Sequence, residues 1–265
     1  MTSLISSFMG ENRANATSPW GPVSAIFMTF GLFAFQIFST VVFGLVFVVS
    51  LFGAAVFKNG LGEGQMALLV DPIIIAIALG YVSTFILLLF VAGRRGGKMS
   101  DVLLFRRPQN LISNVLLGIM IVGVFFVCLS WVIQTFFPQD NAANEQQMKE
   151  LFGMILHTKF LWLGVGIVVI GAPVLEESIF RGFLLTSFAQ TRIGFWWAVV
   201  ATSAFWALIH FYAVSMMVGL FVFGILLSFL VRRAGSVWVG IIMHALWNGV
   251  VTAAVLVSLS GVGQI

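Results

Sequence analysis

Six long stretches without any Asp, Glu, Lys or Arg dominate this chain of 265 residues. They comprise residues 14–57, 72–93, 108–139, 160–175, 193–231 and 234–265. A helix that crosses the hydrocarbon core of a bilayer, about 30 Å thick, needs roughly 20 predominantly apolar residues. The chain has only 8% charged residues, whereas soluble domains have about 25%. A soluble globular domain is therefore excluded, and we expect an all-α, polytopic transmembrane helix bundle.

The lengths of these stretches predict about seven transmembrane helices, with an eighth if the first stretch folds back on itself. The helices are expected within residues 22–57, 72–92, 110–137 and 160–188, twice within 193–231 with a break near 213–215, and within 237–259. The third helix should stop at Pro138, because the residue before a proline disfavours the helical conformation. A short amphipathic helix should follow it and continue to His157.

Positive charges collect between the second and third expected helices, and they indicate the orientation of the protein. The basic residues of this loop are Arg94, Arg95, Lys98, Arg106 and Arg107. Because cytoplasmic loops of membrane proteins are enriched in Lys and Arg, we expect the loop and the N-terminus to be cytoplasmic. The net charge of +4 thus reflects topology. No nucleic acid is expected as a partner, because the apolar stretches leave no room for a separate aqueous domain.

A few ionisable or strongly polar residues lie inside the apolar stretches, where a charge costs about 2.5 to 3.5 kcal/mol at the helix centre. They are Glu176, Glu177, Arg181, His210, His244 and Asn248. Glu177 and Arg181 are four residues apart, so they share a helix face and predict a structural ion pair. Glu176 points about 100° away, with no basic residue three or four places later, and must find its partner on another helix. His244 and Asn248 also share one face.

These side chains suit hydrolysis if they converge in a pocket of low dielectric constant. Glu176 can act as a general base toward water, and His210 can position or share the proton. His244 and Asn248 can donate hydrogen bonds to a developing oxyanion. Alternatively, Glu176, His210 and His244 could bind a divalent ion such as zinc and leave one position for water. The residues themselves leave both mechanisms open, and interhelical polar contacts of a purely structural kind are a third interpretation.

Together the three segments resemble the CPBP family of intramembrane proteases, which are relatives of the type II CAAX prenyl endopeptidases. The family pattern is EExxxR, then FxxxH, then HxxxN, on successive helices. Glu176, Glu177 and Arg181 match the first motif, and His244 with Asn248 match the third. His210 matches the second, but Trp206 stands where the pattern has Phe. We expect this exchange to affect packing more than chemistry. The likeness covers roughly residues 160–255.

The resemblance implies an intramembrane endopeptidase with Glu176 as the water-activating carboxylate, His210 assisting, and His244 with Asn248 stabilising the oxyanion. It implies a membrane-anchored or lipidated peptide or protein as substrate. The family is commonly labelled metalloprotease, and a metal-independent glutamate mechanism is the alternative. The implied organisation is a cytoplasmic segment 1–23, variable transmembrane helices with the basic loop in 24–157, and the catalytic core in 158–260.

Two other functions remain open for this fold. One is a catalytically silent binding or immunity protein that sequesters a membrane peptide. The other is a small transporter, which is less favoured because the intramembrane polar residues cluster at one site and the two halves show no repeat.

The two intramembrane histidines raise a question of depth. Counted from the cytoplasmic helix ends, His210 lies about 15 residues after Gly194, whereas His244 lies about 8 residues into its helix, a difference of roughly 10 Å. We expect the fifth helix to begin after Gly194, with the aromatic residues 195–197 at the membrane interface.

Overall fold

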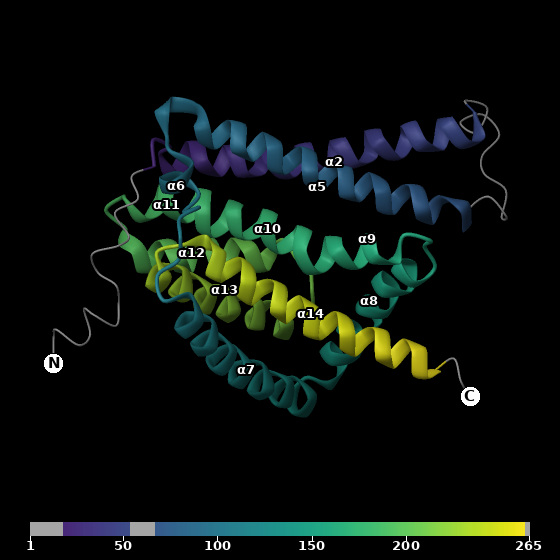
Figure 1. Cartoon of the computed structure of the whole chain (residues 1–265). Coiled ribbons are helices and arrows are strands. Elements are labelled where there is room, and N and C mark those ends of the chain that lie inside the picture. The colour runs from purple at the N-terminus through teal and green to yellow at the C-terminus, as the bar shows by residue number, and fades with distance from the viewer. Residues whose placement is uncertain (1–17, 54–66, 263–265) are drawn as a thin grey trace.

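A computed structural model describes residues 18–53 and 67–262, and every regular element within these ranges is a helix (Figure 1). The expected all-α fold is thus confirmed. Most of the expected cytoplasmic segment, residues 1–17, lies outside the described residues.

The first two long helices pack side by side along one edge of the bundle (Figure 1). They are α2 (Pro22–Phe52) and α5 (Val70–Gly93), and the short helix η1 (Ala67–Leu69) leads into α5. Gly80 allows close approach, since a Cβ at this position would overlap Thr40 Oγ1. On the outside of α2 large apolar side chains such as Phe27 and Ile37 are exposed, as expected for a surface that faces lipid. Because α2 is one continuous helix, the first stretch does not fold back, and the eighth span is wrong.

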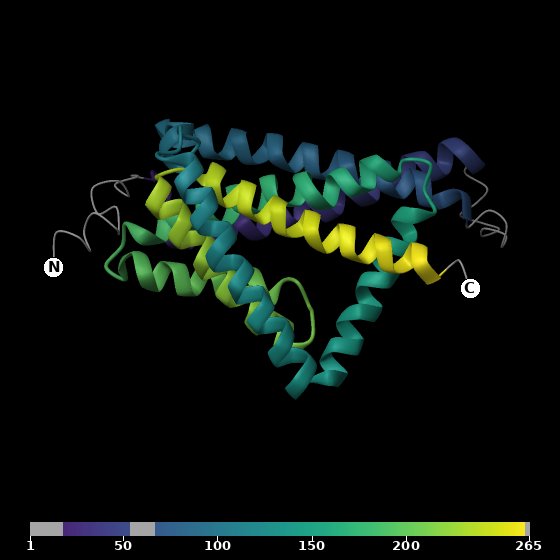
Figure 2. The ribbon, with the colours of Figure 1, turned by 60° about the horizontal axis from the view of Figure 1, so that its bottom comes forward.

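Helix α7 (Leu111–Phe136) and helix α8 (Pro138–Leu156) meet at an angle and form a V (Figure 2). The predicted stop at Pro138 is confirmed, and the proline occupies the first turn of the next helix, where its missing N–H is tolerated. Two side chains of α8 accept backbone hydrogen bonds from a distant segment: Asn144 Oδ1 from Ala213 at 3.2 Å and Asp140 Oδ2 from Ser215 at 3.1 Å. Helix α8 is thereby fixed against the segment that begins α13.

The central span runs from Leu161 to Ala189 and is buried more deeply than the first two helices. It consists of α9 (Leu161–Gly166), the π-helical η3 (Ile167–Gly171), α10 (Ala172–Glu177), the π-helical η4 (Ser178–Leu184) and α11 (Leu185–Ala189). The predicted continuation of this helix through its charged residues is confirmed. Short π-helical segments inside α-helices occur frequently at functional sites, and here they flank the two glutamates.

The C-terminal part contains α12 (Gly194–Leu208), α13 (Val214–Ala234) and α14 (Val237–Val262). Six helices in the described residues are long and apolar enough to cross a membrane, and α12 is a shorter apolar helix. With α12 the count agrees with the seven helices expected. The break in the 193–231 stretch lies at residues 209–213, slightly earlier than expected.

The expected late start of the fifth helix is wrong. Gly194 adopts a φ of +72°, which glycine tolerates at no steric cost, so the chain turns directly into α12 at that residue. His210 lies in the segment after α12, which ends at Leu208, and the two histidines nevertheless line one cavity.

The basic loop is tied to the turn between α13 and α14 at one end of the bundle. It contains η2 (Arg94–Gly96) and α6 (Met99–Val102). The amide of Val237 donates to Leu104 O at 3.1 Å, and that of Gln109 donates to Ala234 O at 3.0 Å. The loop arginines therefore lie at the same end as Arg232 and Arg233. The cytoplasmic location of this end stays a prediction.

Gly182 provides a test of this packing. A Cβ at Gly182 would lie 2.9 Å from the backbone oxygen of Leu103, and backbone cannot rotate away as a side chain can. We expect Gly182→Ala to lower the free energy of unfolding by about 1 to 3 kcal/mol, the usual cost of overpacking. The control is Gly166→Ala, where nothing lies within 4 Å. Equal denaturation midpoints for the two variants in detergent would contradict this account.

Candidate active site

The predicted ion pair between Glu177 and Arg181 lies in the centre of the bundle. Arg181 Nη1 donates a hydrogen bond to Glu177 Oε1 at 2.8 Å. The Arg181 side chain is 1% exposed and the Glu177 side chain is 0% exposed. Glycines on the neighbouring helices make room for both groups. A Cβ at Gly240 of α14 would lie 2.9 Å from Glu177 Oε2, and one at Gly224 of α13 would lie 2.9 Å from Arg181 Nη2. The close approach of α13 and α14 to the central span thus depends on these glycines.

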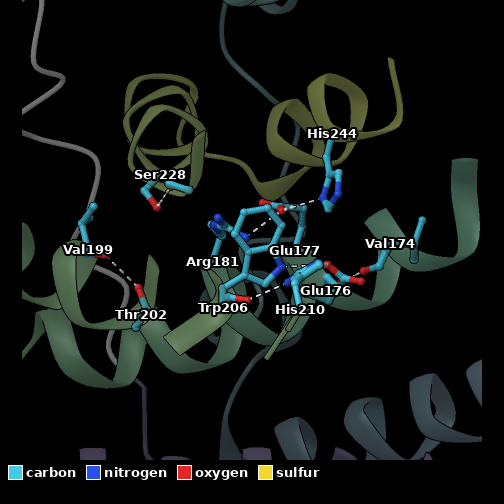
Figure 3. A network of polar contacts seen from close by, with 12 residues as sticks. Val174, Glu176, Glu177, Arg181, Val199, Thr202, Trp206, His210, Ser228 and His244 are labelled. Carbon is cyan, nitrogen blue, oxygen red and sulfur yellow. Dashed lines mark hydrogen bonds and ion pairs between the residues drawn. The ribbon is translucent and has the colours of Figure 1, made fainter. Parts of the chain in front are cut away.

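His244 is held by the same carboxylate. Its Nδ1 lies 3.0 Å from Glu177 Oε1 (Figure 3). Because an ionised carboxylate can only accept a hydrogen bond, Nδ1 carries a proton and donates a hydrogen bond to Glu177. Within the described residues no hydrogen bond to the Nε2 atom of His244 is found, and the residue lines a cavity. Glu177 therefore orients His244 in addition to pairing with Arg181, a role that spacing within one helix could not indicate.

Glu176 finds its partners on and just after α12, as its position on the helix predicted. The indole Nε1 of Trp206 donates to Glu176 Oε2 at 2.7 Å, and His210 Nε2 lies 3.8 Å from the same oxygen (Figure 3). Within the described residues no group donates a hydrogen bond to Glu176 Oε1. The side chain is 15% exposed and lines the cavity, so one carboxylate oxygen is held by protein and the other remains available.

The ring of His210 is also fixed. Its Nδ1 lies 2.7 Å from the backbone oxygen of Trp206, which can only accept, so this nitrogen carries the proton. The neutral ring then has its lone pair on Nε2, on the side of Glu176. Trp206 thus contacts both residues, one through its side chain and the other through its backbone.

Asn248 reaches back to the central span. Its Nδ2 donates to the backbone oxygen of Val168 at 2.9 Å, inside the π-helical segment η3. The carboxamide has a second N–H, and Asn248 lines the same cavity as Glu176 and His244. The structure therefore brings the four expected catalytic residues to one cavity, with the ion pair beside them.

This cavity has a volume of about 550 Å³. Its walls come from α5, α7, α8, the central span, α13 and α14, and most of the lining side chains are apolar, for example Ile77, Leu129 and Val251. The polar groups of the site are a small part of the lining. Such a cavity can take an apolar segment of a ligand and present one bond to a few polar groups.

A metal centre does not fit these residues. Among the described residues no group of three His, Cys, Asp or Glu side chains is placed to hold a metal ion. The residues whose side chains are of a metal-binding type are Glu176, His210 and His244. However, the indole N–H of Trp206 already donates a hydrogen bond to Glu176 Oε2. The metalloprotease expectation is therefore not supported, and no chemical step below uses a metal.

Trp206 is the site residue whose contact sequence reasoning missed. It is fully buried, so its side chain is part of the packed core. However, its indole also binds the carboxylate of Glu176, which is not a matter of packing. The signal in the sequence was the spacing of four between Trp206 and His210, but this spacing could not show that the indole reaches Glu176 on another helix.

Comparison with known families agrees with this geometry. Residues 158–250 match the family model described as type II CAAX prenyl endopeptidase Rce1-like. Neither a curated protein nor a solved structure matches the chain. The matched residues contain the whole set of polar residues described above, and with the six apolar helices they indicate an integral membrane protein. Residues 158–250 therefore match an Rce1-like domain, consistent with the resemblance to the CPBP proteases, and this match indicates a CAAX protease-like endopeptidase.

Proposed function

We propose that the protein is an intramembrane endopeptidase in which Glu176 activates a water molecule against a peptide bond. The observation that carries this proposal is the asymmetry of the Glu176 carboxylate. Oε2 is bound by Trp206 and lies near His210, whereas Oε1 has no partner in the described residues and belongs to a side chain that lines the cavity. A general base needs such an accessible oxygen in a fixed position.

The reaction follows from these positions. A water molecule bound to Glu176 Oε1 gives its proton to the carboxylate while its oxygen attacks the carbonyl carbon of the substrate. A tetrahedral intermediate with a negatively charged oxygen forms. The proton then passes to the leaving nitrogen as the C–N bond breaks, and His210 Nε2, near Glu176, can take part in this transfer. The products are a carboxylic acid and an amine, which ionise to a carboxylate and an ammonium group, and Glu176 returns to its ionised form.

We propose that His244 and Asn248 stabilise the oxyanion. Because His244 Nδ1 donates to Glu177, its Nε2 can donate to an oxyanion when the ring is protonated on both nitrogens. Asn248 uses one N–H on Val168 O and has a second one to offer. Preorganised donors of this kind are typically worth 10²–10³-fold in rate, or about 2.7 to 4 kcal/mol each.

We propose that the substrate is a membrane-anchored or lipidated peptide. The apolar walls of the cavity favour a ligand with an apolar segment, and the Rce1-like match suggests a CAAX-type substrate. In this proposal the bilayer holds the substrate at the level of the site.

The first prediction of the proposed function concerns Glu176. We expect Glu176→Gln to lower the rate of cleavage by about 10²–10⁴-fold, because the amide cannot accept the proton from water. The measurement is release of fluorescence from a quenched farnesylated CAAX peptide in proteoliposomes, together with the ends of membrane peptides in expressing cells. The control is Glu145→Gln on α8, whose side chain is exposed. If Glu176→Gln cleaves at the wild-type rate, or keeps its full biological effect, a silent binding protein becomes the better account.

The second prediction concerns the ion pair. Arg181→Met leaves Glu177 buried without its guanidinium and should lower the free energy of unfolding by about 3 to 5 kcal/mol. The double variant Glu177→Gln with Arg181→Met should recover most of this loss, because replacing both charges is often neutral. Thermal unfolding in detergent measures both. A double variant as unstable as Arg181→Met would show that the charges are not coupled.

The third prediction concerns metals. Extended dialysis against a chelator should leave cleavage unchanged, because in the proposed reaction Glu176 activates the water as a general base without a metal ion. Metal content of the active protein is measured in parallel. Loss of activity that is restored by one equivalent of zinc would instead establish the metal mechanism.

A further inference from the structure

We propose that Trp206 is a positioning residue for the water-activating carboxylate: its indole N–H holds Glu176 Oε2 and thereby directs Oε1 toward the bound water. This inference rests on the proposed function of Glu176 and deepens it. The family motif has Phe at this position, and a phenyl ring has no donor to offer. The interaction therefore comes from this chain's own departure from the motif.

The indole is immobile, and this allows it to fix the carboxylate. Trp206 is fully buried. The guanidinium of Arg181 lies 4.5 Å from the centre of its ring, and the rings of His210 and His244 meet it edge-on at 4.9 Å and 5.4 Å between centroids. Since the ring is enclosed by these neighbours, the direction of its N–H is determined by the packing of three helices.

The hydrogen bond itself is of a strong kind. At 2.7 Å between Nε1 and Oε2 it has the length typical of a bond to an ionised acceptor. The cation of Arg181 over the ring face attracts the π electrons and makes the indole N–H a better donor. Arg181 thus pairs directly with Glu177 and acts on Glu176 through Trp206.

Without this bond the carboxylate would lose its orientation. Glu176 is partly exposed to the cavity, and His210 Nε2, at 3.8 Å from Oε2, is beyond hydrogen-bond distance. The side chain could then rotate, and the water would be held in several positions. Misplacement of a reacting group by about 1 Å can cost about 10²-fold in rate.

A positioning role predicts a loss in turnover without a loss in substrate binding. Trp206→Phe keeps an aromatic ring near Arg181 and removes the N–H. We expect kcat to fall by about 10- to 100-fold with KM little changed, because Trp206, although it lines the cavity, is fully buried. The matched control is Trp197→Phe on the same helix, where the side chain is 70% exposed. Thermal unfolding of both variants shows whether they are folded.

A second measurement tests the contact without any substrate. The indole N–H signals of the 8 tryptophans are recorded by ¹⁵N-labelled NMR in detergent, and that of Trp206 is assigned by its loss in Trp206→Phe. We expect this signal to be shifted downfield and to move upfield in Glu176→Gln, since the charged acceptor becomes neutral. It should stay in place in the control Glu145→Gln.

The outcomes separate this inference from the proposed function. A Trp206 signal that ignores Glu176→Gln overturns the contact itself. An inactive Glu176→Gln together with wild-type kcat in a folded Trp206→Phe overturns the positioning role and leaves the proposed function intact. A fully active Glu176→Gln removes the proposed function, and the positioning role falls with it. A fall in kcat at constant KM, with the expected NMR shift, supports both.

Discussion

The buried ion pair between Glu177 and Arg181 is the interaction on which the rest of this structure depends. Both side chains are at most 1% exposed. They lie in the middle of a membrane-spanning helix, where an unpaired charge would be costly. The pair constrains its surroundings, because Gly240 and Gly224 must let α14 and α13 approach it. It also fixes two aromatic rings, that of His244 through a hydrogen bond and that of Trp206 through the guanidinium. The ion pair that stabilises the bundle and the side chains that line the candidate active site therefore belong to one network of contacts.

The adjacent glutamates of the motif have opposite environments, and this difference gives them different chemistry. Glu177 is saturated by donors on one oxygen and enclosed by protein, so it cannot reach a water molecule in the cavity. Glu176 is rotated away on the same helix, bound by one donor and open to the cavity. A rotation of about 100° around the helix axis thus separates a carboxylate that organises the site from one that can react. The Rce1-like match over residues 158–250 is consistent with this division of the central span.

Much of this arrangement could be predicted from the sequence, because its signals are local. The charge-free stretches predicted the positions of the long helices, and Pro138 predicted the end of α7. The spacing of four residues predicted the ion pair between Glu177 and Arg181. What could not be predicted depends on contacts between helices. The bond from Trp206 to Glu176 joins residues 30 apart, and the bond from His244 to Glu177 joins residues 67 apart. Similarly, α12 begins at Gly194 because this residue adopts a positive φ. The positions of charged residues in the sequence do not indicate this backbone conformation.

The central claim is that Glu176 faces the bond to be cleaved. Its most direct test is a cryo-electron-microscopy structure of Glu176→Gln, reconstituted in a lipid nanodisc with a farnesylated CAAX peptide trapped in the cavity. We predict that the scissile carbonyl carbon lies one water molecule away from the side chain of residue 176, with the carbonyl oxygen directed toward His244 and Asn248. A peptide bound away from residue 176, or a metal ion between residue 176 and the two histidines in a wild-type complex, would contradict the account.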